Sequence, residues 1–157
     1  REMIRQDDYR LVMASSAIPV VCHPVELNGV PYFDGGLSDA IPVRHALERG
    51  CGKLVVILSK NRDYVRKPQG MRAAYHIACR RYPNIVKAIR RRHTVYNQNF
   101  REVFDLEQKG RAFVFAPSAS IHVGTYSMDE QAERALYDLG LRDFAQRREQ
   151  LLEFLKA

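Results

Sequence analysis

The chain has 157 residues, a length that supports one domain with a hydrophobic core rather than two full domains. Hydrophobic residues make up 46% of it and charged residues 27%, which excludes a disordered or collagen-like protein, and no apolar run approaches the roughly 18 residues of a membrane span. The net charge is +7, and residues 60–92, with eleven basic side chains and one acidic one, carry the whole positive excess.

The first predicted elements are a helix and a short strand. Residues 4–14 are predicted to be helical, and the helix ends before Pro19 because a proline disfavours helical backbone at the preceding Ile18. The apolar run Val20-Val21-Cys22 is a candidate strand.

A hairpin is predicted next. Asn28-Gly29 separates the apolar runs 25–27 and 30–33, and both residues tolerate the positive φ angles of a type I′ turn. Pro31 cannot donate a ladder hydrogen bond, so we expect the return strand to be short or to lie at a sheet edge.

The middle of the chain predicts a helix and a strongly apolar strand. We expect the helix to run from Ile41 to Glu48, with Pro42 in its first turn and Gly50 just past its end. The run 53–59, which is continuously apolar from Leu54 to Leu58 and rich in β-branched residues, predicts a parallel strand that is covered on both faces.

Two helices are predicted after this strand. Apolar residues recur at helical spacing from Met71 to Tyr82. Pro83 then starts a second helix, whose apolar positions from Ile85 to Val103 lie on one face.

The C-terminal part predicts a second buried strand and two further helices. The strand is the apolar run 111–117. Ser127 and Glu130 have the spacing of a capping box, so we expect a helix to start there and to end at Gly140. A last amphipathic helix is expected up to Leu155.

Two buried strands separated by helices predict an α/β fold with a right-handed crossover. Two or three strands cannot complete a doubly wound sheet, and the chain starts abruptly at Arg1 within a structured stretch. We therefore expect these residues to be a piece of a longer protein, with apolar surface left exposed and self-association into homo-oligomers favoured.

Asp34 is the sharpest candidate for a catalytic residue. It directly follows a predicted strand, which is where α/β sheets place functional groups. Gly35 and Gly36 permit positive φ angles and let another backbone approach closely. The structural alternative is that Asp34 caps a turn that the two glycines shape.

Histidines and cysteines give no comparable signal. The five histidines have no HxxxH or HExxH spacing, so we expect no metal site, and a turn role bonded to backbone is favoured for His23 over lining the site. Cys22, Cys51 and Cys79 have no CxxC spacing, and we expect them to be buried or half-buried small hydrophobes in a reducing compartment.

Three stretches together resemble the patatin-like phospholipase family. They are the Ala-Ser-Ser-Ala-Ile-Pro run at 14–19, Asp34-Gly35-Gly36, and a proline, Pro42, eight residues after the aspartate. The strand at 113–117 and the segment 129–140 are also similar to the family's bacterial members. The resemblance covers most of residues 8–140. It implies a three-layer α/β/α sheet whose C-terminal portion is residues 1–125, and residues 126–157 are then a helical extension.

The resemblance implies a serine acyl hydrolase that cleaves lipid or phospholipid esters with a Ser–Asp dyad and without a cofactor. Asp34 matches the catalytic aspartate, and a carboxylate within hydrogen-bond reach can take the proton that makes a hydroxyl nucleophilic. Gly35 and Gly36 match the active-site loop. The family's nucleophile lies in a Gly-x-Ser-x-Gly turn, with a glycine-rich oxyanion loop upstream, and this sequence contains neither.

The missing nucleophile motif leads to three expectations. The nucleophile lies in an upstream segment, and these 157 residues alone hydrolyse nothing. Ser15 and Ser16 support a turn instead of acting as nucleophiles. Asp39 serves as loop structure or as a cap for the helix after Pro42.

The basic segment 60–92 leaves three alternatives open: a solvated helix face, attraction to an anionic lipid surface, and nucleic-acid binding. The last is least favoured because no nucleic-acid-binding motif is present. The residues concerned are Arg80, Arg81, Lys87, Arg90, Arg91 and Arg92. The competing function is therefore a non-catalytic α/β module that binds an anionic membrane or nucleic acid through this segment. In both cases we expect a cytoplasmic protein with at most a peripheral membrane association.

Overall fold

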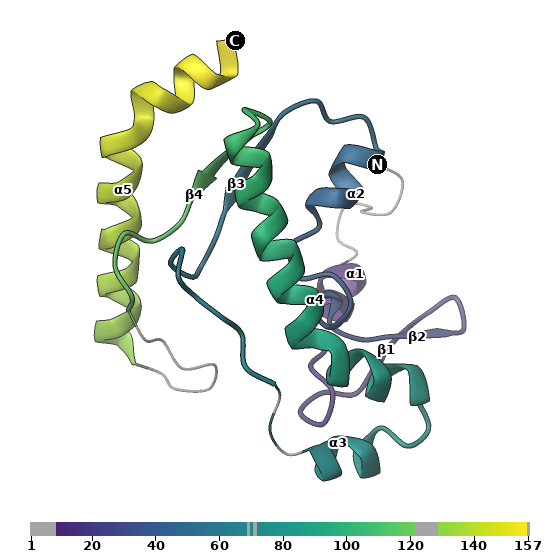
Figure 1. Cartoon of the computed structure of the whole chain (residues 1–157). Coiled ribbons are helices and arrows are strands. Elements are labelled where there is room, and N and C mark those ends of the chain that lie inside the picture. The colour runs from purple at the N-terminus through teal and green to yellow at the C-terminus, as the bar shows by residue number, and fades with distance from the viewer. Residues whose placement is uncertain (1–8, 69, 71, 122–128, 157) are drawn as a thin grey trace. The chain divides into compact units, whose positions relative to one another are not determined.

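The computed structural model describes residues 9–68, 70, 72–121 and 129–156, except for the side chain of residue 72. Its elements in chain order are α1 (Arg10–Ser15), β1 (Val25–Leu27), β2 (Val30–Tyr32), the short 3-10 helix η1 (Gly35–Leu37), α2 (Val43–Glu48), β3 (Leu54–Ile57), α3 (Arg72–Ala78), α4 (Pro83–Gln108), β4 (Ala112–Phe115) and α5 (Glu130–Lys156) (Figure 1). The fold is mixed α/β, as the sequence predicts.

These elements form two compact units. The first contains the residues up to Pro42 together with Arg66–Phe100, and the second contains Val43–Val65 and Arg101–Ala157. Helix α4 contributes its first part to the first unit and its last part to the second. Each unit therefore combines segments that are far apart in the sequence.

The hairpin of the first unit forms as predicted. β1 and β2 are antiparallel, with Leu27 opposite Val30, and the turn residues Asn28 and Gly29 have φ angles of 52° and 76°. Positive φ at both positions is what a type I′ turn requires. Pro31 lies in this two-stranded sheet, where its missing N–H removes no central ladder bond.

The segment Val20-Val21-Cys22 is a turn rather than the predicted strand. The Cys22 N–H donates to the Ile18 carbonyl at 2.8 Å, and Val20 has a φ of 78°. Pro19, just before the turn, is fully buried, whereas Val20 and Val21 are 52% and 61% exposed. The apolar run therefore reverses the chain direction beside a buried proline and pairs with no described strand.

The helices of the first unit lie where the sequence predicts them. α1 is described from Arg10, and residues 4–8 of the predicted helix lie outside the described residues. α3 ends at Ala78, so Tyr82, the last position of the first predicted helical pattern, lies outside the helix, and α4 starts at Pro83 as predicted. Within this unit one face of α4 is buried, through Val86, Ile89, Tyr96 and Phe100.

Helix α2 is shorter at its start than expected. It begins at Val43, so Ile41 and Pro42 precede it. Its end agrees with the prediction, because Gly50 has a left-handed φ of 86° and its N–H donates to the Leu47 carbonyl at 2.9 Å.

The second unit is built on a parallel pair of strands. β3 and β4 pair in register along their whole lengths, as the predicted crossover requires. Helix α5 lies along β4 (Figure 1). Phe154 packs against Phe113 with ring centroids 5.7 Å apart, and Phe144 packs against Phe115 at 5.8 Å.

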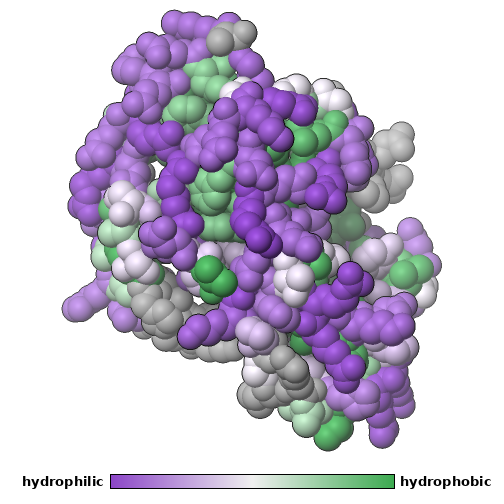
Figure 2. Space-filling model, viewed as in Figure 1, coloured by the Kyte–Doolittle hydropathy of each residue, from purple (hydrophilic) through white to green (hydrophobic). Residues whose placement is uncertain are grey.

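Strand β3 is covered on one face only. Its neighbour β4 is buried from Ala112 to Val114, as predicted, but in β3 Val55 and Ile57 are 44% and 79% exposed. These two residues share a face because side chains alternate along a strand. A continuously apolar strand such as β3 is thus not necessarily buried on both faces. Figure 2 shows exposed hydrophobic residues in green among purple hydrophilic ones on the face that it draws.

Helix α5 continues through Gly140, so the predicted break there is wrong. Asp129 caps the helix, since its Oδ1 accepts a hydrogen bond from the Ala132 N–H at 3.0 Å. Ser127, the expected cap, lies outside the described residues. A helical glycine costs about 1 kcal/mol relative to alanine, which the packing of α5 on β4 outweighs. None of the described helices has both the length and the apolar character to cross a bilayer.

Candidate active site

The candidate aspartate lies directly after the hairpin, at the start of a tight turn. Asp34 is the N-cap of η1, and its Oδ1 accepts a hydrogen bond from the Gly36 N–H at 2.7 Å. The side chain is half-buried. Its Oδ2 accepts no hydrogen bond from the described residues, so this oxygen is open to a further donor. The same conformation therefore caps the turn and leaves one carboxylate oxygen for chemistry.

Gly36 is the glycine of the pair at which a side chain does not fit. A Cβ atom there would lie 3.0 Å from Asp34 Oδ1 and 3.5 Å from a terminal nitrogen of Arg92. At Gly35 the nearest atom would be Ser15 Oγ at 3.7 Å, which is ordinary van der Waals contact. Neither Gly35 nor Gly36 has a positive φ. The close approach at Gly36 thus comes from side chains and not from another backbone, and the positive φ angles that the two glycines allow are not used.

The segment 14–19 lies against this loop. The Asp34 N–H donates to the Ala17 carbonyl at 2.9 Å, and α1 contacts η1. Ala14, Ala17 and Pro19 are buried. Two stretches that carry the family resemblance are therefore joined by a backbone hydrogen bond.

Helix α4 also binds this loop. Arg92 Nε donates to the Gly36 carbonyl at 2.9 Å, and Asn99 Nδ2 donates to Asp39 Oδ1 at 2.7 Å. Asp39 thus has a structural role in the loop. Sequence reasoning missed Asn99 and placed Arg92 on the basic surface, although the seven-residue spacing of the two puts them on one helix face. Contacts across such a distance in sequence leave no local signal.

The described residues supply a base but no matching nucleophile motif. Ser15 is the last residue of α1 and is exposed beside Gly35. Ser16 is the C-cap of α1, and its N–H donates to the Met13 carbonyl at 3.2 Å. The predicted turn role fits Ser16. By itself, the arrangement can accept a proton from a hydroxyl that is brought to Asp34 from elsewhere.

The residues predicted to face an anionic surface fall into two groups. Five of them are exposed: Arg80, Arg81, Lys87, Arg90 and Arg91. Arg92 is half-buried and binds the loop that begins at Asp34. The structure thus places Arg92 with the candidate site and the other five on the surface of the first unit.

Histidines and cysteines form no metal cluster among the described residues. His23 is exposed and lines a groove in the first unit, and His122 lies outside the described residues. Cys79 is buried, but Cys22 and Cys51 are exposed, so the predicted burial is wrong for these two. The reason for Cys22 is the turn that replaces the expected strand.

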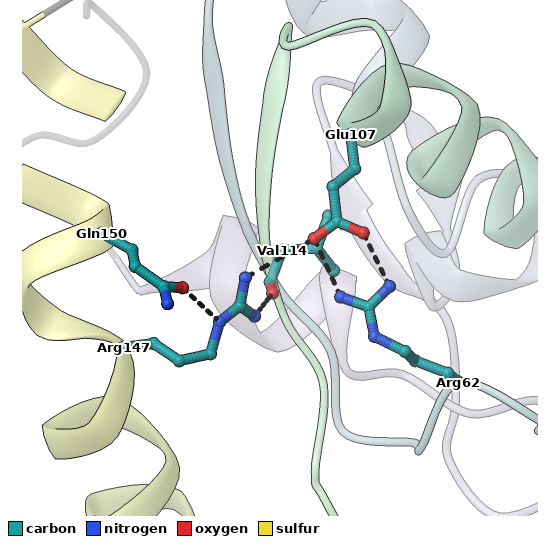
Figure 3. Close-up of polar contacts among 5 residues, drawn as sticks. All are labelled: Arg62, Glu107, Val114, Arg147 and Gln150. Atoms are coloured by element: carbon teal, nitrogen blue, oxygen red, sulfur yellow. Dashed lines mark hydrogen bonds and ion pairs between the residues drawn. The ribbon is translucent and has the colours of Figure 1, made fainter. Parts of the chain in front are cut away.

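A separate polar cluster lies in the second unit (Figure 3). Arg62 donates to both carboxylate oxygens of Glu107, at 2.6 and 2.8 Å, and Arg147 lies 3.7 Å from the same carboxylate. Arg147 also donates to the Val114 carbonyl and lies over the Phe113 ring, 4.5 Å from its centroid. The cluster therefore ties the end of α4 to β4 and α5.

Electrostatics within this cluster favour the charged forms. The hydrogen bond from Arg62 lowers the pKa of Glu107 below its ordinary value of 4.5, against the opposing effect of partial burial, and the positive charges of Arg62 and Arg147 add to the lowering. The same hydrogen bond raises the pKa of Arg62. The two arginines compensate the charge of Glu107, so we assign the cluster to the stability of the second unit.

Comparison with known families divides the chain into two parts. Residues 9–47 match the model of the patatin-like phospholipase family, a range that contains α1, the hairpin, Asp34 and both loop glycines. Residues 82–156 match a domain of unknown function, DUF6363, a range that contains α4, β4 and α5. The resemblance seen in the sequence is therefore confirmed over a shorter range than residues 8–140.

Among curated proteins, the chain is 40% identical over 79 residues to "Uncharacterized protein YjjU" of Escherichia coli (strain K12). This match covers 41% of the chain and 22% of that protein, so the matched part is about a fifth of the relative's length. No solved structure matches the chain. Residues 9–47, with the candidate aspartate, are thus similar to a segment of patatin-like phospholipases.

Proposed function

We propose that this chain contributes the catalytic aspartate of a patatin-like acyl hydrolase that cleaves lipid or phospholipid esters. Asp34 is the general base of a Ser–Asp dyad, and the serine comes from a segment outside these 157 residues. One observation carries the proposal: the Asp34 loop and the segment 14–19 are hydrogen bonded to each other inside the range that matches the patatin-like family.

The geometry of Asp34 suits a general base. Its Oδ1 is held by the Gly36 N–H, which restricts rotation of the carboxylate, and its Oδ2 remains for a serine hydroxyl. As the serine oxygen bonds to the acyl carbon, the carboxylate takes its proton and then passes that proton to the leaving alkoxide. A water molecule, deprotonated by the same carboxylate, then bonds to the acyl carbon; the bond to the serine oxygen breaks, and the carboxylate returns the proton to that oxygen.

Arg92 and Asn99 act as positioning residues in this proposal. They bind the loop at Gly36, inside η1, and at Asp39, just after it, and neither takes the proton. Holding a base within reach of the hydroxyl is a large part of such catalysis, because a misplacement of about 1 Å can cost about 100-fold in rate.

The test is ester hydrolysis by the complete protein. Asp34→Asn should lower turnover of a p-nitrophenyl ester and of phosphatidylcholine by about 10²–10⁴-fold, the usual contribution of a general base, with an unchanged circular dichroism spectrum. Glu26→Gln, an exposed carboxylate on β1 of the same unit, is the matched control and should keep full activity.

Two results would contradict the proposal. Full turnover by the Asp34→Asn protein would remove Asp34 from the reaction. Turnover by the isolated 157 residues that disappears in Asp34→Asn would show that the nucleophile lies within this chain.

A further inference from the structure

The first unit has an open groove in which apolar and basic side chains meet. One wall is the turn from Val20 to Pro24, with Phe33 beside it, and the other is the segment from Ile77 to Tyr82 at the end of α3. Phe33 packs edge-on against Tyr82 with ring centroids 5.1 Å apart, which joins the two walls. The groove is therefore lined by two segments that are distant in sequence and are held together by this ring contact.

The apolar side chains of this groove are exposed to an unusual degree. Val20, Val21 and Ile77 are 52%, 61% and 70% exposed. Figure 2 shows green hydrophobic atoms next to purple hydrophilic ones where Figure 1 places α3. Exposed aliphatic side chains such as these can insert into an apolar phase, because the turn and the helix end that carry them are packed against each other.

Basic side chains accompany these apolar tips. Arg80 and Arg81 both line the groove and are exposed. Residues 77–92 hold six basic side chains and no acidic one. With Arg92 bound to the loop, Lys87, Arg90 and Arg91 of α4 add exposed positive charge in the same unit.

This combination fits the surface of an anionic bilayer better than a nucleic acid. At a bilayer, aliphatic side chains enter the acyl boundary while arginines bind headgroup phosphates. Single-stranded nucleic acids need exposed aromatic rings for base stacking, and here the groove's rings, Phe33 and Tyr82, pack against each other.

We propose that this groove docks the first unit onto an anionic phospholipid surface, with Val20, Val21 and Ile77 entering the acyl boundary and Arg80 and Arg81 binding headgroup phosphates. The docking does not depend on the chemistry proposed for Asp34. Because Phe33 lines the groove and precedes Asp34, the docked surface adjoins the loop of the proposed base.

Co-sedimentation of the 157-residue chain with vesicles tests the proposal. Phosphatidylcholine vesicles that contain phosphatidylserine should bind the chain, and pure phosphatidylcholine vesicles should bind it much more weakly. Arg80→Ala with Arg81→Ala should weaken binding by about 30-fold, or about 5-fold for each arginine. Val21→Asp should weaken vesicle binding by about 10-fold, because it puts a charged side chain where the valine would enter the acyl boundary.

Matched control variants distinguish an effect of the groove on vesicle binding from an effect of net charge and from a loss of the proposed catalysis. Arg111→Ala with Arg142→Ala makes the same change in net charge at exposed sites of the second unit, and Val65→Asp changes a valine that is 69% exposed outside the groove. Both should bind as the unchanged chain does. Asp34→Asn should also bind normally, so a failure of docking and a failure of the proposed catalysis are distinguishable.

Three results would overturn the docking proposal. The first is equal binding to vesicles with and without phosphatidylserine. The second is an equal loss of binding in the groove variants and their matched controls. The third is retention of an RNA or DNA oligonucleotide through Arg80 and Arg81 without any vesicle binding, which would assign the groove to nucleic acid.

Discussion

Arg92 donates a hydrogen bond from Nε to the Gly36 carbonyl at 2.9 Å and so joins α4 to the loop that begins at Asp34. Two helical turns later, Asn99 donates to Asp39 at 2.7 Å. The first bond is made within η1 and the second just after it. The position of the candidate base thus depends on a helix more than fifty residues away in the sequence.

Replacing Arg92 should loosen this loop. Arg92→Ala removes a hydrogen bond from a charged donor at a half-buried site, so we expect a loss of about 1 kcal/mol in the free energy of unfolding, or roughly 2–4 °C in melting temperature. In the complete protein, ester turnover should fall by about 10- to 100-fold through misplacement of Asp34. Thermal melting and ester assays measure the two effects.

Arg91→Ala is the control for Arg92→Ala, since Arg91 is the adjacent arginine and is exposed. Its melting temperature and its turnover of a soluble p-nitrophenyl ester should not change. Equal effects of the two substitutions would mean that the loop depends on positive charge along α4 and not on the bond to Gly36.

The two loop glycines should differ in their tolerance of alanine. In Gly36→Ala the new Cβ would lie 3.0 Å from Asp34 Oδ1, so the carboxylate must move and its capping bond weakens. We expect a loss of about 1–3 kcal/mol, as for overpacking elsewhere, together with a fall in ester turnover of the complete protein. In Gly35→Ala the nearest contact is 3.7 Å, and stability should change by less than about 0.5 kcal/mol. Urea unfolding of both variants checks this, and a Gly35 variant as unstable as the Gly36 variant would refute it.

The Glu107 cluster should make stability depend on pH in the acid range. Folding lowers the pKa of Glu107, so its stabilisation is complete above the ordinary pKa of 4.5 and is lost as the pH falls through the lowered value. Glu107→Gln should therefore destabilise the protein at pH 7 by about 1 kcal/mol, because Arg62 is partly exposed. The difference in the free energy of unfolding between this variant and the unchanged protein should shrink as the pH falls below 4.5.

Urea unfolding of both proteins between neutral and acid pH measures this difference. Glu149→Gln serves as the control, since Glu149 pairs with the adjacent Arg148 and its side chain is 78% exposed. For this variant the difference from the unchanged protein should be near zero at every pH. A constant difference for Glu107→Gln would contradict the assigned cause of the pKa shift.

Gly140 and Gly110 should respond to alanine in opposite directions. Gly140 lies inside α5 with no atom within 4 Å of a new Cβ, so Gly140→Ala should stabilise the protein by about 0.5–1 kcal/mol. Gly110 ends α4 with a φ of 66°, so Gly110→Ala should destabilise it by about 1 kcal/mol. Calorimetric melting distinguishes the two, and destabilisation by Gly140→Ala would indicate that the glycine is needed for packing.

Several features of the fold could be predicted from the sequence because short-range sterics decide them. Asn28-Gly29 favours a type I′ turn in whatever protein it occurs, Pro83 favours the first turn of a helix, and Gly50 favours a left-handed helix end. The Asp34 cap is local for the same reason, since donor and acceptor are two residues apart.

Other features depended on contacts that no local pattern records. Gly140 stays helical because α5 packs along β4. Arg92 is half-buried and not part of the exposed basic surface, because its Nε donates to the Gly36 carbonyl. By itself the sequence determined the hairpin turn, the start of α4 and the residue that the proposed chemistry needs, because these are set within a few bonds. Only the tertiary structure decided which apolar faces are covered and which side chains hold Asp34, because free energies from distant contacts exceed local preferences of about 1 kcal/mol.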